Sequence, residues 1–122
     1  MFEVELYETE DGKTPVQDFL DSLDYKMRAK LHMLISLLEE KGNALRMPYT
    51  EAIEDGIFQL RAIQGNDIAR ALFFFFAGGR IVITNGFIKK TPKTPRSEID
   101  LAKARREDYY SRRGKEKENA VP

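Results

Sequence analysis

The apolar run from Leu72 to Phe76, which reads Leu-Phe-Phe-Phe-Phe, constrains the fold more than any other segment. A strand with one wet face alternates apolar and polar residues, whereas this run has no polar position. We therefore predict a central strand over residues 68–77 with apolar neighbours on both faces, and we assign the phenylalanines to the core. The alternative for one of these rings is a platform on which nucleic-acid bases stack.

Other strands are predicted around this one. Residues 57–63 and 81–88 are also strand-like, and the three strands are separated by Gly65-Asn66 and by Gly78-Gly79. Strands joined so tightly form an antiparallel meander. At the start of the chain, apolar and polar residues alternate from position 2 to position 7, which predicts a strand with one buried face and one wet face.

Three helices are predicted from start and stop signals. Thr14-Pro15 supplies a capping residue and a proline at the first helical position, with Gln17 completing a capping box. A second helix runs from near Asp24 to Gly42 and forms an antiparallel hairpin with the first. The third covers residues 95–113. The fold class is α+β, with one domain over residues 1–113 and a flexible polar tail over residues 114–122.

Composition removes several kinds of chemistry. The chain has no cysteine and one histidine, so a disulfide framework, a thiolate metal site and a cysteine nucleophile are excluded, and we expect no metal and no cofactor. No apolar run approaches the roughly 20 residues of a membrane span, and the first residues do not resemble a signal peptide. We therefore expect a soluble, cytoplasmic protein.

Charge is divided unevenly along the chain, although the net charge at pH 7 is zero. Residues 1–55 carry six Lys or Arg against thirteen Asp or Glu, whereas residues 56–113 carry twelve against five. A polyanion such as a nucleic acid would be attracted to the basic half. The competing explanation is that the two halves attract each other within the fold, and the sequence leaves both explanations open.

The corner between the strand over 81–88 and the last helix has the features of an anion site. The strand ends in Lys89-Lys90, the loop adds Lys93, and a helix begins near Thr94 and Pro95. Free backbone N–H groups and the positive end of the helix dipole would point towards the same corner as the lysines. The alternative is an ordinary solvated loop with surface lysines.

The order and spacing of several motifs resemble a known family. In the order strand, two helices, antiparallel sheet and terminal helix, the chain carries Ile57-Phe58-Gln59-Leu60-Arg61, Ala69-Arg70, Gly86-Phe87-Ile88-Lys89-Lys90-Thr91-Pro92-Lys93-Thr94-Pro95 and Glu98-Ile99. This pattern resembles the RelE/HigB-type toxins of type II toxin–antitoxin modules, in the phage-derived HigB-like branch of the RelE/ParE superfamily. The resemblance covers residues from Tyr7 to about Arg113.

The resemblance implies a RelE/ParE-like fold and a function. The members of this family cleave mRNA on the ribosome as endoribonucleases, by attack of a ribose 2′-OH on the adjacent phosphate without a metal ion. An antitoxin silences them. The implied partners are therefore a helix-turn-helix antitoxin, mRNA and the ribosome, with no membrane. The alternatives are a non-enzymatic toxin like the ParE relatives, which act through protein contacts, and a catalytically weakened RNA-binding relative.

The resemblance also assigns roles to residues. The reaction builds negative charge on phosphorus and needs fixed cations, and Arg70 matches the family's phosphate-binding arginine. We expect the catalytic residues to be Arg70, Lys89 and Arg61. The residues expected to contact RNA or its phosphates are Lys90, Lys93, Phe87, Asn85 and Thr94.

Two positions depart from the family pattern. Asn85 stands where a histidine is frequent, and Ala69 stands where a tyrosine is frequent. Proton transfer therefore needs another group, and we expect Lys89 to supply it because neighbouring cations lower the pKa of a lysine. Alternation predicts that Lys89 faces the same side as Phe87 and that Lys90 faces the other. We expect His32 to be an exposed helix residue without a role.

Overall fold

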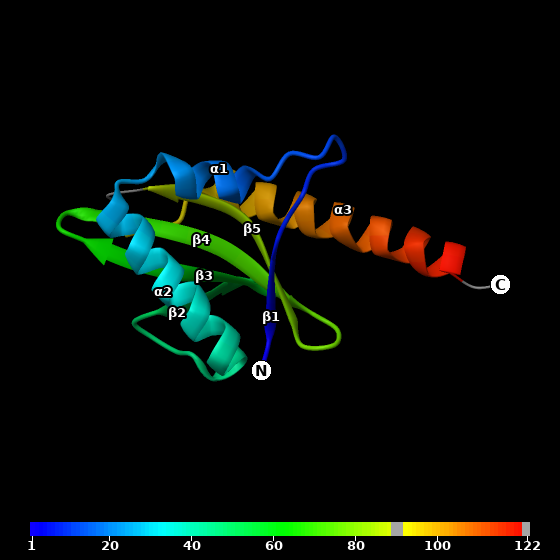
Figure 1. Ribbon diagram of the computed structural model, residues 1–122, viewed down its shortest axis with the longest axis horizontal. Coiled ribbons are helices and arrows are strands. Elements are labelled where there is room, and N and C mark those ends of the chain that lie inside the picture. The colour runs from blue at the N-terminus through cyan, green and yellow to red at the C-terminus, as the bar shows by residue number, and fades with distance from the viewer. Residues whose placement is uncertain (89–91, 121–122) are drawn as a thin grey trace.

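The computed structural model describes residues 1–88 and 92–120, with side chains described as far as Arg113. It is an α+β fold in which helices cover both faces of one five-stranded mixed sheet, with strand order β1-β5-β4-β3-β2 (Figure 1). The elements are β1 Glu3–Leu6, α1 Pro15–Ser22, α2 Tyr25–Lys41, the 3-10 helix η1 Gly42–Ala44, β2 Thr50–Glu54, β3 Ile57–Gln64, β4 Asp67–Phe76, β5 Arg80–Ile88 and α3 Arg96–Ala120.

Strand β4 lies at the centre of the sheet, as its apolar run predicted. Phe73 belongs to the core layer under α1 and α2, and Phe75 packs against that layer. Leu72 and Phe74 belong to the layer under α3, where Phe74 meets Tyr109 edge to face with ring centroids 5.7 Å apart. The phenylalanines are therefore core residues with neighbours on both sides.

The meander is confirmed, because each of β3, β4 and β5 pairs antiparallel with the strand before it. Strand β2 was not predicted. Strand β1 adds to the edge of β5 in parallel, with Val4 opposite Ile81. The predicted wet face of β1 holds at Glu3, which is exposed, while Glu5 is partly buried. It ends after the strand, because Tyr7 is buried and its hydroxyl donates to Asp108 Oδ2 of α3 over 2.6 Å.

The predicted helix signals are confirmed in part. Pro15 begins α1, but the Thr14 side chain makes no capping hydrogen bond, so the predicted capping box does not form. Asp24 caps α2 by accepting from the backbone N–H of Met27 over 2.9 Å, and Gly42 ends that helix with φ +53°. Helix α3 begins at Arg96 and runs to Ala120, beyond the predicted end at Arg113.

The helices lie on opposite sides of the sheet. Helices α1 and α2 follow each other through a short connection and contact β5 and β3 respectively, whereas α3 crosses β5, β4 and β3 on the other face (Figure 1). Ile99, Ala102 and Tyr109 of α3 are buried, as predicted. Among the helices in the described ranges, none combines the length and the apolar character needed to cross a membrane.

An irregularity in the pairing of β4 with β5 decides which side chains face α3. Leu72 pairs with Asn85 while the next residue, Phe73, pairs with Ile83, so β5 carries one extra residue at this point. The bulge reverses the alternation of β5. Ile83 therefore packs under α1 and α2, whereas Asn85 faces α3.

Gly86 follows the bulge and lies under α1. A Cβ atom placed on Gly86 would lie well inside van der Waals contact with the ring of Phe19. We predict that Gly86→Ala lowers the free energy of unfolding by about 1–3 kcal/mol, because the ring must move away. Urea unfolding of Gly86→Ala, Phe19→Ala and the double variant measures it. The double variant should be more stable than the sum of the single effects predicts, and strict additivity would contradict the contact.

Candidate functional site

Two arginines and an aromatic residue form one row across neighbouring strands, which we call the arginine row. Arg61 of β3 pairs with Arg70 of β4, and Arg70 pairs with Phe87 of β5. All three side chains lie on the face that α3 covers further along the sheet. Leu72 and Phe74 share this face with Arg70, because they follow it by two and four residues, and both pack under α3. Figure 1 shows the β3–β4 hairpin extending beyond the start of α3. The row lies just beyond the first turn of α3, because Glu98 in that turn bonds to Asn85, which pairs with Leu72.

Arg70 is fully buried, with 0% of its surface exposed, whereas Arg61 is half-buried. Burial lowers the pKa of Arg70, the positive charge of Arg61 lowers it further, and the negative charge of Glu51 opposes both effects. A guanidinium stays protonated at neutral pH even so. Two like charges therefore occupy paired positions on neighbouring strands, where they raise the local affinity for an anion.

The next row towards α3 is polar. Glu51 of β2 pairs with Gln59 of β3, and the hydroxyl of Thr94 donates to Gln59 Oε1 over 2.7 Å. This hydrogen bond fixes the loop before α3 over β3. Glu51, Lys93 and Thr94 also line an open cleft of about 380 Å³.

Acidic residues accompany the described cations at the corner before α3. Glu51 and Glu54 line the same cleft as Lys93 and Arg96, so acids accompany the cations. Lys93 is exposed and Phe87 is half-buried. Lys89 and Lys90, the remaining predicted cations of this corner, lie outside the described residues, and their roles stay predictions.

Asn85 is buried and holds α3 against β5. Its Nδ2 donates to Glu98 Oε1 over 2.9 Å and to the backbone oxygen of Glu98 over 3.2 Å, while its Oδ1 accepts from Thr84 Oγ1 over 2.6 Å. These bonds occupy both the donor and the acceptor of the amide. The structure thus shows a structural task for Asn85, and RNA contact by this residue stays a prediction.

The basic side chains of α3 are largely paired with acids of the N-terminal half. Glu54 accepts from Arg96 and Lys103, Asp55 accepts from Arg106, and Arg113 contacts Glu5. The charge division along the sequence therefore stabilises the fold in part. The mutual attraction that competed with a polyanion partner is observed, and the polyanion expectation now rests on the arginine row.

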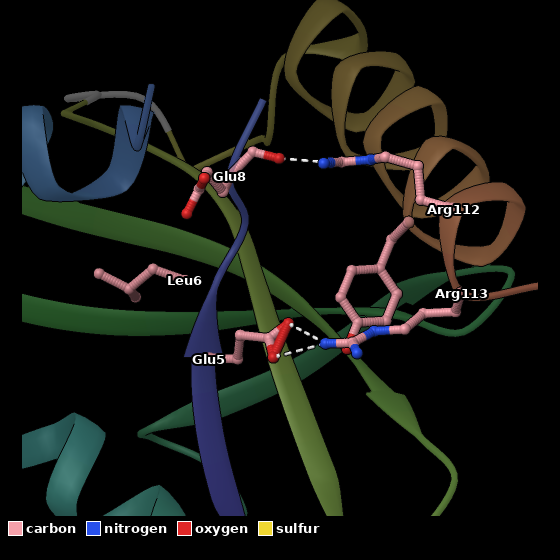
Figure 2. Close-up of a pocket in the computed structure, with 6 residues that line it drawn as sticks. Glu5, Leu6, Glu8, Arg112 and Arg113 are labelled. Carbon is pink, nitrogen blue, oxygen red and sulfur yellow. Dashed lines mark hydrogen bonds and ion pairs between the residues drawn. The ribbon is translucent and has the colours of Figure 1, made fainter. Parts of the chain in front are cut away.

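A second cleft, of about 360 Å³, lies between β1 and the C-terminal half of α3 (Figure 2). Arg113 donates to both carboxylate oxygens of Glu5, and Arg112 donates to the backbone oxygen of Glu8. Arg112 also pairs with Asp108 over 2.8 Å. Acceptors of the chain itself engage both guanidinium groups, so this cleft is a weaker anion site than the arginine row.

Residues 18–107 match the family model described as Phage derived protein Gp49-like (DUF891). The chain belongs to this family. The matched range covers most of the chain and includes Arg61, Arg70 and Phe87. The family is known in toxin–antitoxin systems, which agrees with the coarser part of the resemblance and leaves a RelE or HigB assignment as a proposal. No curated protein matches the chain.

Glu51 is the residue at this site that the sequence analysis missed. It lies in the unpredicted strand β2, and only the pairing of β2 with β3 brings its carboxylate near the arginine row. His32 is exposed on α2, as predicted. Within the described ranges, no three His, Cys, Asp or Glu side chains are grouped so that they could hold a metal ion.

The ion pairs of Glu54 generate a prediction about acid stability. Hydrogen bonds from Arg96 and Lys103 lower the pKa of Glu54 from 4.5 to about 2. A lowered carboxyl pKa stabilises the fold above pH 4.5, and this contribution is lost as the pH falls from 4.5 towards 2. We therefore predict that Glu54→Gln is less stable than wild type at neutral pH and loses less stability over that acid range.

Urea midpoints measured across pH 2 to 7 test this prediction. Glu40→Gln is the matched control, because Glu40 is exposed at the end of α2 and has no partner among the described residues. The control should follow the wild-type curve. Equal acid sensitivity of Glu54→Gln and wild type would show that the two ion pairs contribute nothing to the folded state.

Proposed function

We propose that this protein is the toxin of a type II toxin–antitoxin module and acts as a metal-independent endoribonuclease on ribosome-bound mRNA. The resemblance to RelE/HigB-type toxins and the membership of the Gp49-like family support the proposal. The observation that carries it is the pairing of Arg61 with Arg70 on a face of the sheet beyond the start of α3. Fixed guanidinium charges are what a pentavalent phosphate transition state requires.

The two arginines have different tasks in this proposal. Arg61 is half-exposed and is the cation that an RNA phosphate meets first. Arg70 lies behind it, fully buried, and its charge strengthens the positive potential at the same point. Phe87, in the same row, offers a ring edge or face beside the phosphate. The row thus combines charge with an apolar surface for a nucleotide.

Proton transfer needs one acceptor and one donor. Glu51 is a carboxylate close enough to Arg70 to influence its pKa, and we assign to it the removal of the proton from the ribose 2′-OH. Lys89, which we expect to transfer protons because neighbouring cations lower the pKa of a lysine, takes the role of donor to the 5′-oxygen leaving group. The attacking oxygen then forms the bond to phosphorus as the bond to the 5′-oxygen breaks.

The partners follow from the same charges. An antitoxin, expected to be a helix-turn-helix protein, silences the toxin by placing acidic side chains against the arginine row. Such a partner neutralises the like charges that Arg61 and Arg70 hold side by side. The site of action is the ribosome, and no membrane is involved.

One observation favours a second candidate, a toxin that acts by protein binding without catalysis. Asn85 stands in the position where the family frequently carries a histidine, and its amide is fully engaged by Thr84 and Glu98. It therefore cannot take part in proton transfer. The cleavage experiments below distinguish the two candidates.

We predict that Arg61→Ala and Arg70→Ala each lower RNA cleavage by about 10²- to 10³-fold, because each removes a charge that stabilises the transition state. Arg61→Lys should restore little, since an ammonium lacks the two-pronged guanidinium geometry with which Arg61 meets the phosphate. Mapping of new mRNA 5′ ends after induced expression measures cleavage in cells. Growth arrest by wild type without any new 5′ ends would overturn the nuclease and favour the protein-binding toxin.

Arg46→Ala is the control for these variants, because Arg46 is exposed in the loop before β2 and outside the arginine row. It should retain full cleavage. Thermal unfolding identifies any variant that fails to fold. If Arg70→Ala is unstable, the test relies on Arg61→Ala, since the partly exposed side chain of Arg61 contributes less to the core.

We predict that Glu51→Gln slows cleavage by about 10²- to 10⁴-fold, because an amide cannot accept the proton of the 2′-OH. RNA binding should not weaken, since the change removes a negative charge beside the phosphate. Single-turnover cleavage and filter binding of the same RNA measure the two effects separately. The matched control is Glu40→Gln, and full activity of Glu51→Gln would assign proton removal to another group.

A further inference from the structure

The outward face of α2 is uncovered within the part of the chain that the structure describes. The helix packs on the core through Met27, Leu31, Leu34 and Leu38, which are buried. On the opposite side, Tyr25 exposes 73% of its surface and Met33 exposes 56%. These two apolar side chains lie about two helical turns apart on the same broad outward side, since eight residues advance about 80° beyond two full turns.

Small residues lie along the middle of the same face. Ala29 and Ser36 are exposed and separated by seven residues, which is about two turns, so they lie one above the other along the helix. Small side chains allow a second helix to approach closely. Tyr25 and Met33 then flank the line of closest approach.

The charges on this face oppose the dipole of α2. Lys26 lies in the first turn, where the helix end is positive, and Glu40 lies in the last turn, where it is negative. Both are exposed, and neither makes an ion pair or a hydrogen bond within the described residues. A second helix running in the opposite direction would place an acid near Lys26 and a base near Glu40.

The pattern is complementary to itself. Lys26 and Glu40 lie at equal distance in sequence from Met33, one on each side, and Ala29 and Ser36 are related in nearly the same way. A two-fold axis near Met33 therefore brings Lys26 of one copy to Glu40 of the other and Ala29 to Ser36. This symmetry selects a second copy of the chain over an unrelated helix.

We propose that α2 is the interface of a homodimer in which two copies pair antiparallel about this two-fold axis. The interface lies on the opposite side of the sheet from the arginine row, because α1 and α2 cover the face that α3 leaves free. Dimer formation and RNA cleavage are therefore independent. A single pair of helices buries little area, so the dimer is weak and forms at high protein concentration.

Sedimentation equilibrium of the full chain from about 1 µM to about 1 mM tests the proposal. Wild type should change from monomer to dimer within this range. Lys26→Glu should weaken association by about tenfold, because two attractive pairs become repulsive. Lys26→Glu/Glu40→Lys should restore wild-type association, and a mixture of Lys26→Glu with Glu40→Lys should associate better than either protein alone.

Lys13→Glu is the matched control for charge. Lys13 is exposed in the turn between β1 and α1, and the substitution changes the net charge by the same amount. It should associate as wild type does. Circular dichroism shows that each variant remains folded, and the double variant keeps the test valid if one single variant does not fold.

Disulfide trapping tests the direction of the helices, since the chain has no native cysteine. In the proposed dimer, a mixture of Ala29→Cys and Ser36→Cys should cross-link faster than either protein alone, because like positions lie about 10 Å apart along the axis. Asp18→Cys on α1 is the control and should stay monomeric.

Three results would overturn the proposal. Sedimentation as a monomer at every concentration would show that the α2 face does not pair with itself. Equal association of wild type and Lys26→Glu would assign any dimer to another surface. Faster cross-linking of Ala29→Cys with itself than with Ser36→Cys would show a parallel arrangement.

Discussion

The burial of β4 on both faces is the constraint on which the rest of the structure depends. Its phenylalanines alternate between the two core layers, so α1 and α2 must cover one face and α3 the other. The same strand carries Arg70, which thereby enters an environment of low dielectric beside Arg61. A charge in such a place is costly unless another group balances it. The hydrophobic core and the proposed anion site therefore arise from one strand, and the site takes its rigidity from the packing of the aromatic rings.

Ion pairs give the unequal charge of the two halves a structural meaning. Helix α3 is held on the sheet by ion pairs from its basic side chains to Glu5, Glu54 and Asp55. Exposed pairs of this kind contribute little each, so their role is to set the position of α3 more than to stabilise the whole fold. That position matters for the proposed function, because the place where α3 begins decides how much of the sheet remains available for the proposed RNA substrate.

The sequence predicts the helices and strands that have strong local signals. It does not predict a strand that forms only because it pairs with a neighbouring strand. The run from Leu72 to Phe76, Pro15, Asp24 and Gly42 determine their elements through burial and capping alone. Strand β2 is short and mixed in character, and its pairing with β3 rather than its own pattern makes it a strand. Glu51 was missed for that reason. The engagement of Asn85 was equally beyond prediction, because a bulge in β5 turns this residue towards Glu98 at the start of α3. The sequence suggested a polyanion partner for the basic half of the chain, because it does not show that acids of the N-terminal half pair with the basic residues of α3.

The parallel pairing of β1 with β5 has a consequence for the newly made chain. The residues of β1 are synthesised well before their partners Arg80–Ile83 of β5, so the edge formed by Glu3–Leu6 must wait while the meander assembles. Contacts between such distant segments form late and slowly. Helix α3, which closes over β1 through Tyr7 and Asp108, follows later still. A nascent chain therefore carries the arginine row on β3 and β4 before the fold around it is complete.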